Sequence, residues 1–496
     1  CALLWMIETT ALHSLSKKCR SLNQLKQIHA HLLQTHLIRS RFAIGTVLSA
    51  AETAYNGSFF FYACSVFDRL LYRTTYTYNN MIKGYVLNRS PAAAVMCYMD
   101  MLRRGIAANN YSFPPLIKAS TILAPKSEMI GRLVHAHVVM FGSAEDPFVV
   151  SSLIEFFSTI LDMKVARKLF DGMPRKDVVL WTTMVDGYGK VDDVENARKL
   201  FDRMAERNSI SWSAMMAAYC RVSDFEEVLH LFRQVQEAGT APNESMLVTV
   251  LTACAQLGAL VQGLWVHTYV VLHGFDTNQK VATSLVNMFS KCGYLEPALS
   301  VFGGMTTKDA GAWNAIISAA AMSGDARKSV QLFHEMSASG TQPNETTFVA
   351  VLSACTHARL VKEGLKLFEQ MSPVYRVEPR LQHYGCVIDL LARAGMLEEA
   401  EKLVEERIGG FGRGDVNVWG ALLSACRIYG NFEMGIRIWK KLADLKVADS
   451  GMHKLSYNMY KEVGMEAEAK RVQRMFKGKR MYKTPGCSSV DAEYFA

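Results

Sequence analysis

A pattern that recurs every 31 to 35 residues or so runs along almost the whole chain, and it limits the possible folds more than any other feature. Many units open with an aromatic residue in a short apolar segment, and these residues are Tyr78, Trp181, Trp212, Trp313 and Trp419. About twenty residues later follows Phe-x-x-Met, at Phe170/Met173, Phe201/Met204, Phe302/Met305, Phe333/Met336 and Phe368/Met371. Aligned on these residues, the units begin near 41, 75, 110, 147, 178, 209, 244, 279, 310, 345, 381 and 416, with a further one from about 450.

Each unit has the pattern of two helices. The first segment is short and apolar, and the second is amphipathic, as in ENARKLFDRM. Glycine recurs at the fifteenth position (Gly258, Gly293, Gly324, Gly395 and Gly430), which suits a turn with positive φ. One such hairpin cannot bury its own apolar face, so neighbouring hairpins must stack. The sequence therefore predicts an all-α superhelical solenoid of stacked helix-turn-helix repeats.

Most of the recurrent residues are interpreted as core. This includes Cys254, Cys355 and Cys426, which share the eleventh position as small apolar fillers. The odd total of 11 cysteines without paired spacing argues against a secreted disulfide framework. The uncharged stretch from Ser245 to Phe275 has the length of a membrane span, but the repeat divides it at Gly258, so we expect no membrane association.

The unit openings (V-x-x-W-T/N), the closings (G-x-x-P-N) and the alternating lengths resemble plant organellar pentatricopeptide repeats, in which standard, long and short units alternate. This resemblance implies a right-handed superhelix. Residues 1–40 are interpreted as a partial repeat and 41–415 as tandem repeats. Residues 416–496 resemble the C-terminal extension motifs of plant editing factors, including the box Lys-Thr-Pro-Gly-Cys-Ser at 483–488.

In that family, the residue after the aromatic and the last residue of a unit together read one RNA base. Here the pairs are Asn79 with Asn109, Ser151 with Asp177, Thr182 with Asn208, Ser213 with Asn243, Thr283 with Asp309, and Asn314 with Asn344. Such residues also cap helices, and for any one of them capping is an equal alternative. The family's code gives the target Y-n-G-A-A-n-G-Y, in which the Asn–Asn pairs read a pyrimidine with cytosine somewhat favoured. The long units carry Pro114, Val248 or Val349 instead of a polar reader, and Gly45/Thr74 and Gly385/Asp415 are left unassigned.

Two further sets bear on RNA affinity. Apolar residues at the second position of a unit can wedge between bases, namely Tyr76, Phe148, Val179 and Ile210, whereas Lys280 and Gly311 cannot. Basic residues share the thirteenth position and can follow the phosphates, namely Lys190, Arg221, Lys291 and Arg393. For each of these basic residues taken alone, an ordinary solvated surface is an equal alternative. The net charge of +9 is compatible with a polyanionic partner if it is concentrated on one face.

The sequence lacks the motifs of catalysis. A zinc cytidine deaminase of the DYW type needs His-x-Glu and Cys-x-x-Cys, and neither occurs. We therefore expect no catalytic residues, no metal and no cofactor in the chain as given, and predict a single-stranded RNA-binding recognition factor for C-to-U editing of organellar transcripts.

A DYW-type deaminase acting in trans and other organellar editing factors are the expected partners, in the mitochondrion or alternatively the chloroplast. Two alternatives stay open: an RNA stability, splicing or processing factor, and a protein-binding scaffold. The start at Cys1 leaves a preceding targeting segment open.

Overall fold

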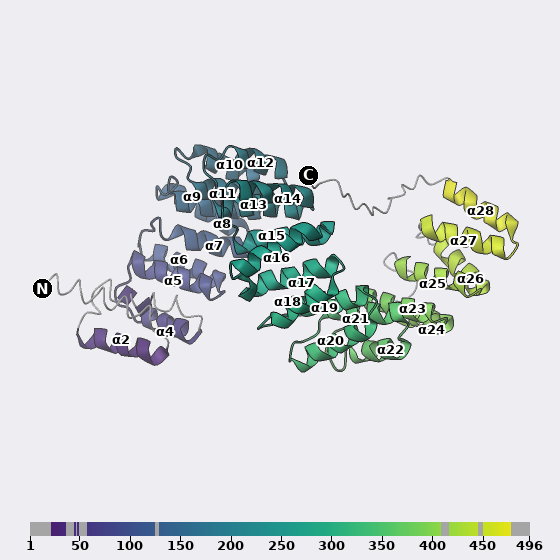
Figure 1. Ribbon diagram of the computed structural model, residues 1–496. Helices are drawn as coiled ribbons and strands as arrows, with labels where there is room; N and C mark the ends of the chain where they lie inside the picture. The colour runs from purple at the N-terminus through teal and green to yellow at the C-terminus, as the bar shows by residue number, and fades with distance from the viewer. Residues whose placement is uncertain are drawn as a thin grey trace. The chain divides into compact units, whose positions relative to one another are not determined.

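The structure, a computed structural model, describes residues 21–35, 44–45, 47–48, 57–124, 128–407, 416–444 and 450–477. All regular elements in these ranges are helices, and they fall into two compact units, Cys1–Thr249 and Val250–Ala496 (Figure 1). The predicted all-α class of stacked hairpins is confirmed in each unit.

The first unit contains α2 (Leu22–Gln34), α4 (Gly57–Asp68), α5 (Thr75–Leu87), α6 (Pro91–Arg103), α7 (Phe113–Leu123), α8 (Glu128–Met140), α9 (Pro147–Thr159), α10 (Met163–Gly172), α11 (Val178–Lys190), α12 (Val194–Asp202), α13 (Ser209–Arg221) and α14 (Phe225–Glu237). Helix α15 (Glu244–Leu257) contains the division between the units. The second unit continues with α16 (Leu260–Leu272), the 3-10 turn η2 (Phe275–Thr277), α17 (Gln279–Lys291), α18 (Leu295–Gly304), α19 (Ala310–Met322), α20 (Ala326–Ala338), α21 (Glu345–Ala358), α22 (Val361–Gln370), α23 (Leu381–Arg393), α24 (Leu397–Arg407), α25 (Val416–Ile428), α26 (Phe432–Asp444), α27 (Ser450–Glu462) and α28 (Glu466–Lys477).

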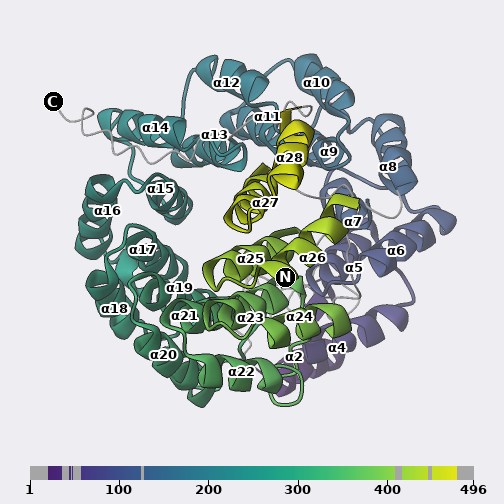
Figure 2. The same cartoon turned by 90° about the vertical axis from the view of Figure 1, so that its right-hand side faces the viewer.

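The helices of each unit form two layers. The first helix of a hairpin packs on the first helices of its neighbours, as α11 does on α9 and α13, and α19 on α17 and α21. The second helix packs on its own first helix and on the next hairpin, as α20 does on α19 and α21. In the second unit, Figure 2 shows α17, α19, α21 and α23 in one layer and α18, α20 and α22 in the other. Each hairpin thus covers the apolar face of its neighbour.

The first helices begin where the repeat predicts. Eleven of them start at the predicted unit openings, at 75, 147, 178, 209, 244, 279, 310, 345, 381, 416 and 450. The unit at 110 differs because its helix α7 starts only at Phe113, after a turn in which the Ser112 backbone N–H donates to the Asn109 carbonyl (2.8 Å). Two prolines then occupy the first turn of the helix, where a missing N–H costs no hydrogen bond. The opening of the unit at 41 lies largely outside the described residues.

The fifteenth position lies in the left-handed region in all the fully described units except the one at 110, where Ala124 is right-handed (φ −49°). The five predicted glycines there have φ between 68° and 84°. Other units place a non-glycine residue at the same position and keep the conformation, at Arg89, Leu161, Asp192, Ser223 and Arg359. The turn geometry is therefore set by the stacking of the two helices, because it persists at residues with an intrinsic cost for positive φ.

The recurrent aromatic residues join consecutive hairpins. The Phe that closes one unit packs edge-to-face on the aromatic residue that opens the next, with centroid distances of 4.9 Å for Phe170–Trp181, 4.8 Å for Phe201–Trp212 and 4.7 Å for Phe302–Trp313. The cysteines of the eleventh position are fully buried, and burial raises the pKa of Cys254 to about 12 and that of Cys355 to about 11. Their predicted role as core fillers is confirmed.

The uncharged stretch of 245–275 is divided between α15 and α16, with a turn at Gly258. Within the described ranges, no helix combines the length and the apolar character needed to cross a membrane.

Candidate nucleic-acid interface

The candidate site is a stripe along the first helices of the hairpins. Positions two, five, nine and thirteen of a helix share one face because they are three or four residues apart. In α11 the opposite face is buried, with Leu180, Met184 and Val185 at 0% exposure. Val179, at the second position, is 55% exposed, and Thr182, at the fifth, is buried at the edge of the stripe. Packing therefore leaves the wedge position on the face that the stack does not cover, and it places the reader position at the buried edge of that face.

The structure brings most of the predicted reader pairs into direct contact, although their members are 26 or 30 residues apart in sequence. Four pairs lie within side-chain hydrogen-bond distance, namely Asn79 Nδ2 to Asn109 Oδ1 (3.0 Å), Ser213 Oγ to Asn243 Oδ1 (3.0 Å), Thr283 Oγ1 to Asp309 Oδ1 (3.5 Å) and Asn314 Nδ2 to Asn344 Oδ1 (3.2 Å). The Ser213 hydroxyl shares its one proton between Asn243 and the Ser209 carbonyl (2.8 Å). In the pair Thr182 and Asn208, the Thr182 hydroxyl donates to the Val178 carbonyl instead (2.7 Å). No bond joins Ser151 to Asp177 in the part of the chain that the structure describes.

In five of the six pairs the last residue also caps a helix, as the alternative interpretation predicted, whereas Asn109 accepts from the Tyr111 N–H in the turn before α7. Asp177 Oδ1 accepts from the Leu180 N–H (2.8 Å), and Asn208 Oδ1 accepts from the N–H groups of Ile210 and Ser211 (3.0 and 2.9 Å). Capping uses one oxygen of the side chain. The second carboxylate oxygen of Asp177 and the amide nitrogen of Asn208 are left on exposed side chains. The capping bond therefore fixes the side chain while leaving one group for a ligand.

A basic residue just before the cap was not predicted from the sequence as part of the site. Lys176, Arg207 and Lys308 each place their charge 4.8 to 5.3 Å from the centre of the closing Phe ring of the same unit. Each also donates to a carbonyl at the end of the preceding helix, as Lys176 does to Met173 (2.7 Å). The recurrence of Lys or Arg directly before the reader residue was the available signal. These contacts hold the turn that presents the last residue of the unit.

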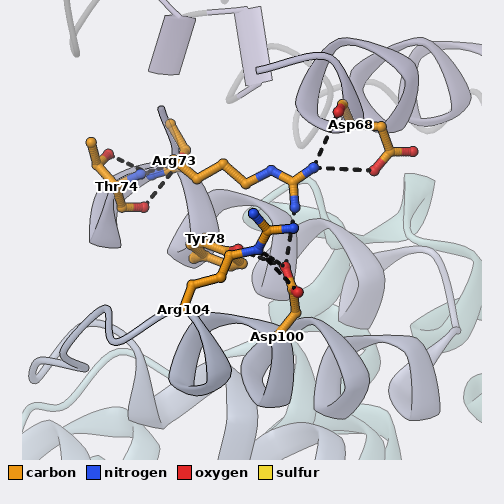
Figure 3. Close-up of polar contacts among 7 residues, drawn as sticks. Asp68, Arg73, Thr74, Tyr78, Asp100 and Arg104 are labelled. Carbon is orange, nitrogen blue, oxygen red and sulfur yellow. Dashed lines mark hydrogen bonds and ion pairs between the residues drawn. The ribbon is translucent and has the colours of Figure 1, made fainter. Parts of the chain in front are cut away.

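Figure 3 shows the turn that leads into α5, where Tyr78 stands in the place that tryptophan takes in other units. The Tyr78 hydroxyl donates to Asp100 Oδ2 (2.6 Å), and Arg73 and Arg104 pair with the same carboxylate (3.1 and 3.0 Å). The hydrogen bond from Tyr78 leads the causes that lower the pKa of Asp100, while burial raises the pKa of Tyr78. The guanidinium of Arg73 also lies 4.5 Å from the Phe67 ring, and Thr74 caps α5. The Tyr78 hydroxyl thus acquires a partner, whereas the indole N–H groups of Trp212 and Trp313 are buried without one among the described residues.

The predicted wedge residues are all exposed. The exposed fractions are 41% for Tyr76, 74% for Phe148, 55% for Val179 and 63% for Ile210. Phe148, Val179 and Ile210 place large apolar side chains at the same exposed position of three successive hairpins, which suits stacking on a planar ligand.

The predicted basic positions are partly neutralised. Asp186 pairs with both Lys190 (2.8 Å) and Arg221 (3.1 Å), and Asp389 pairs with Arg393 (2.9 Å). Lys291 is exposed and has no carboxylate within ion-pair distance among the described residues. The thirteenth position therefore carries less net charge than the sequence alone suggests.

The unassigned unit at 381 differs from the others. Gly385 occupies its reader position, and a hollow of about 770 Å³ opens along α21, α23 and α25. Gly385, Cys386, Ala421, Arg393 and Tyr429 are among its lining residues. The partner position Asp415 and the box at 483–488 lie outside the described residues, as does most of the opening at Gly45, while Thr74 caps α5.

Comparisons with known proteins identify the repeat. The model of the PPR repeat matches residues 179–209, 210–240, 281–309, 346–372 and 383–406, and that of the PPR repeat family matches 73–120 and 308–357. A mitochondrial pentatricopeptide repeat-containing protein of Arabidopsis thaliana is 38% identical over 93% of this chain and 67% of its own length. The chloroplastic protein ELI1 of the same plant is 39% identical over 96% of this chain and 74% of its own. Maize PPR10, solved in complex with an 18-nucleotide psaJ RNA element, matches with a TM-score of 0.52 at 15% identity, over 95% of this chain and 84% of that chain. The chain therefore belongs to the pentatricopeptide repeat family.

Proposed function

We propose that this protein binds single-stranded RNA and reads one base with each polar reader pair. The observation that carries the proposal is the contact between the fifth and the last residue of a unit, the predicted code positions, in four units. Capping alone does not require the fifth residue of one helix to bond the cap of the next. RNA bound to the related PPR10 supports the same ligand class.

The groups left free explain the proposed base preferences. The free carboxylate oxygen of Asp177 or Asp309 is an acceptor, which suits the N1–H of guanine. Asn208 offers amide N–H donors, which suit the N1 lone pair of adenine. Guanine and adenine differ at this atom, so exchanging aspartate and asparagine reverses the match. With the two Asn–Asn pairs accepting a pyrimidine, the proposed target is Y-n-G-A-A-n-G-Y.

The test is a binding titration of the full chain at one stated salt concentration, because phosphate contacts make affinity depend on salt. RNA containing the ordered target is compared with the same bases shuffled. We expect tighter binding to the ordered RNA. Equal binding would refute base reading, and no binding to either RNA would indicate a protein scaffold instead.

We further propose that the bound transcript is an organellar substrate of C-to-U editing. The resemblance of 416–496 to extension motifs supports a docking surface there for a DYW-type deaminase in trans, and the mitochondrial and chloroplastic relatives support an organellar location. The chain would then be a member of the class with alternating long and short units. A pull-down with purified DYW-type deaminase tests this. We expect retention by the full chain and loss after deletion of 416–496, with RNA affinity kept. If both chains behave alike, processing or stabilisation of the transcript becomes the better function.

A further inference from the structure

Each of the two Asn–Asn pairs has a third member that comes from the following helix. Ser112 Oγ donates to the reader Asn79 at Oδ1 (2.7 Å), and Thr347 Oγ1 donates to the reader Asn314 at Oδ1 (2.6 Å). Both hydroxyl residues are fully buried, at 0% exposure. Each stands at the third position of a long unit, so the same arrangement occurs independently in the two units of the fold.

The backbone limits the direction of these hydrogen bonds. The N–H of Asn109 donates to Ser112 Oγ (3.1 Å), and the N–H of Asn344 donates to Thr347 Oγ1 (3.0 Å). Each hydroxyl proton then has two asparagine oxygens within reach, that of the reader (2.7 and 2.6 Å) and that of the last residue (3.2 and 3.1 Å), and the shorter contact is to the reader in both sites. The amide of the reader can then face only one way, with its oxygen held inside the protein.

The remaining groups of the pair are donors. The Oδ1 of Asn109 accepts from Asn79 Nδ2 (3.0 Å) and from the Tyr111 N–H (3.2 Å), and the Oδ1 of Asn344 accepts from Asn314 Nδ2 and the Thr347 N–H. The carbonyl oxygens of both residues are thus engaged. What a base meets is the second N–H of the reader and the amide N–H groups of the last residue.

We infer that Ser112 and Thr347 are positioning residues that make the two Asn–Asn sites prefer cytosine to uracil. The inference rests on the proposed RNA binding. Cytosine presents two adjacent acceptors, N3 and O2, to a pair of donors. Uracil has an N3–H between its two carbonyls, and that N–H needs an acceptor. The amide oxygen of each reader is turned toward a buried hydroxyl, and that of each last residue accepts from the reader and from a backbone N–H, so neither is turned toward the base.

Ser211 provides a natural control. It stands at the same third position, behind the pair Thr182 and Asn208, and is also fully buried. Its hydroxyl donates to the Asn208 backbone carbonyl (2.9 Å) and accepts from the Asn208 N–H (3.0 Å), so it contacts no reader side chain. Removing it perturbs a helix cap without freeing an acceptor on a reader.

The experiment compares the full chain with Ser112→Ala, Thr347→Val and Ser211→Ala, on four RNAs carrying C or U at the first and the last position of the target. We expect the original chain to prefer C at both positions. Ser112→Ala abolishes this preference at the first position only and Thr347→Val at the last only, a change on the order of three- to tenfold in the C-to-U affinity ratio. Ser211→Ala leaves both ratios unchanged, and Ser112→Thr, which keeps a hydroxyl, preserves the preference.

Because the two sites are tested by different variants, misfolding of one variant still leaves the other as a test. A uniform fall in RNA affinity without a changed C-to-U ratio would indicate a structural role and would overturn the inference. Preference for C that persists in both variants also overturns it. An original chain that reads purines but not C against U refutes this inference while keeping the proposed function. An original chain that binds no RNA refutes both.

Discussion

Hairpins that start at 178 and 209 and hairpins that start at 381 and 416 share one scaffold but present different surfaces. The buried faces agree, with Met215 and Met216 in α13 and Leu422 and Leu423 in α25 all at 0% exposure. On the recognition side the first two hairpins carry an exposed apolar residue and, beside it, a buried hydroxyl reader. The last two carry glycine at the reader position, beside a hollow of about 770 Å³. Stacking and recognition therefore use different residues of the same helix, so the recognition residues can change while the stacking residues stay the same.

The largest change in base preference is expected from substituting the last residues of the units that start at 178 and 209. Asn208→Asp with Asn243→Asp replaces amide donors by carboxylate oxygens, which repel the N1 lone pair of adenine and accept from the N1–H of guanine. Each mismatch costs about 1–3 kcal/mol. In competition titrations, the double variant should prefer Y-n-G-G-G-n-G-Y to the original target. Both side chains still cap their helices, so thermal unfolding serves as the control. An unchanged preference would mean that these hairpins do not read bases.

The wedge position is expected to come next. Phe148→Ala removes an aromatic ring that is 74% exposed and should weaken RNA binding by about 1–3 kcal/mol. Leu272→Ala, which removes a 76% exposed side chain of the second-layer helix α16, is the matched control and should leave binding unchanged. Affinity is measured by titration with the target RNA. Equal losses in the two variants would show that exposed apolar area, rather than the stripe, attracts RNA.

Introducing a polar reader at Gly385, where the hairpin has none, should produce a smaller change in base preference. At Gly385 a new Cβ meets nothing nearer than Val418 Cγ2 at 3.7 Å, so Gly385→Asn fits without strain. We expect it to create a base preference at the nucleotide that follows the target, of about the size of one hydrogen bond, 0.5–1.5 kcal/mol. RNAs that differ only in that nucleotide measure the effect. At Gly420 a Cβ lies 3.1 Å from Met452 Cε, so Gly420→Asn should lower the unfolding temperature more.

The smallest effect is expected from single charges of the thirteenth position. Lys291 has no carboxylate partner among the described residues, whereas Lys190 shares Asp186 with Arg221. Lys291→Ala should therefore reduce the slope of log affinity against log salt by up to about 0.7, the value for one phosphate contact with a single strand. Lys190→Ala should reduce it less. Titrations at several salt concentrations decide this, and the reverse order would show that Asp186 turns away when RNA binds.

Local sequence determined the hairpins and their register. Eleven first helices begin at the residues that the repeat predicted, because helix periodicity, caps and turns depend on neighbours within a few positions. The exception, α7, begins at Phe113 after a turn around Ser112. The code positions could likewise be found from spacing within a unit. The basic residue before the cap, such as Arg207, also recurs in the sequence, but its role became clear only from its contact with the closing Phe.

Contacts between consecutive hairpins were decided only by the tertiary structure. The hydroxyl of Ser112 is 33 residues from Asn79, and the similar Ser211 bonds a backbone carbonyl instead. Asp186 neutralises an arginine that is 35 residues away. The physical reason is that one hydroxyl or carboxylate has several partners within reach on adjacent helices. Which of them it bonds depends on how closely and at what rotation those helices stack, and the residue types of a single unit do not specify that distance or rotation.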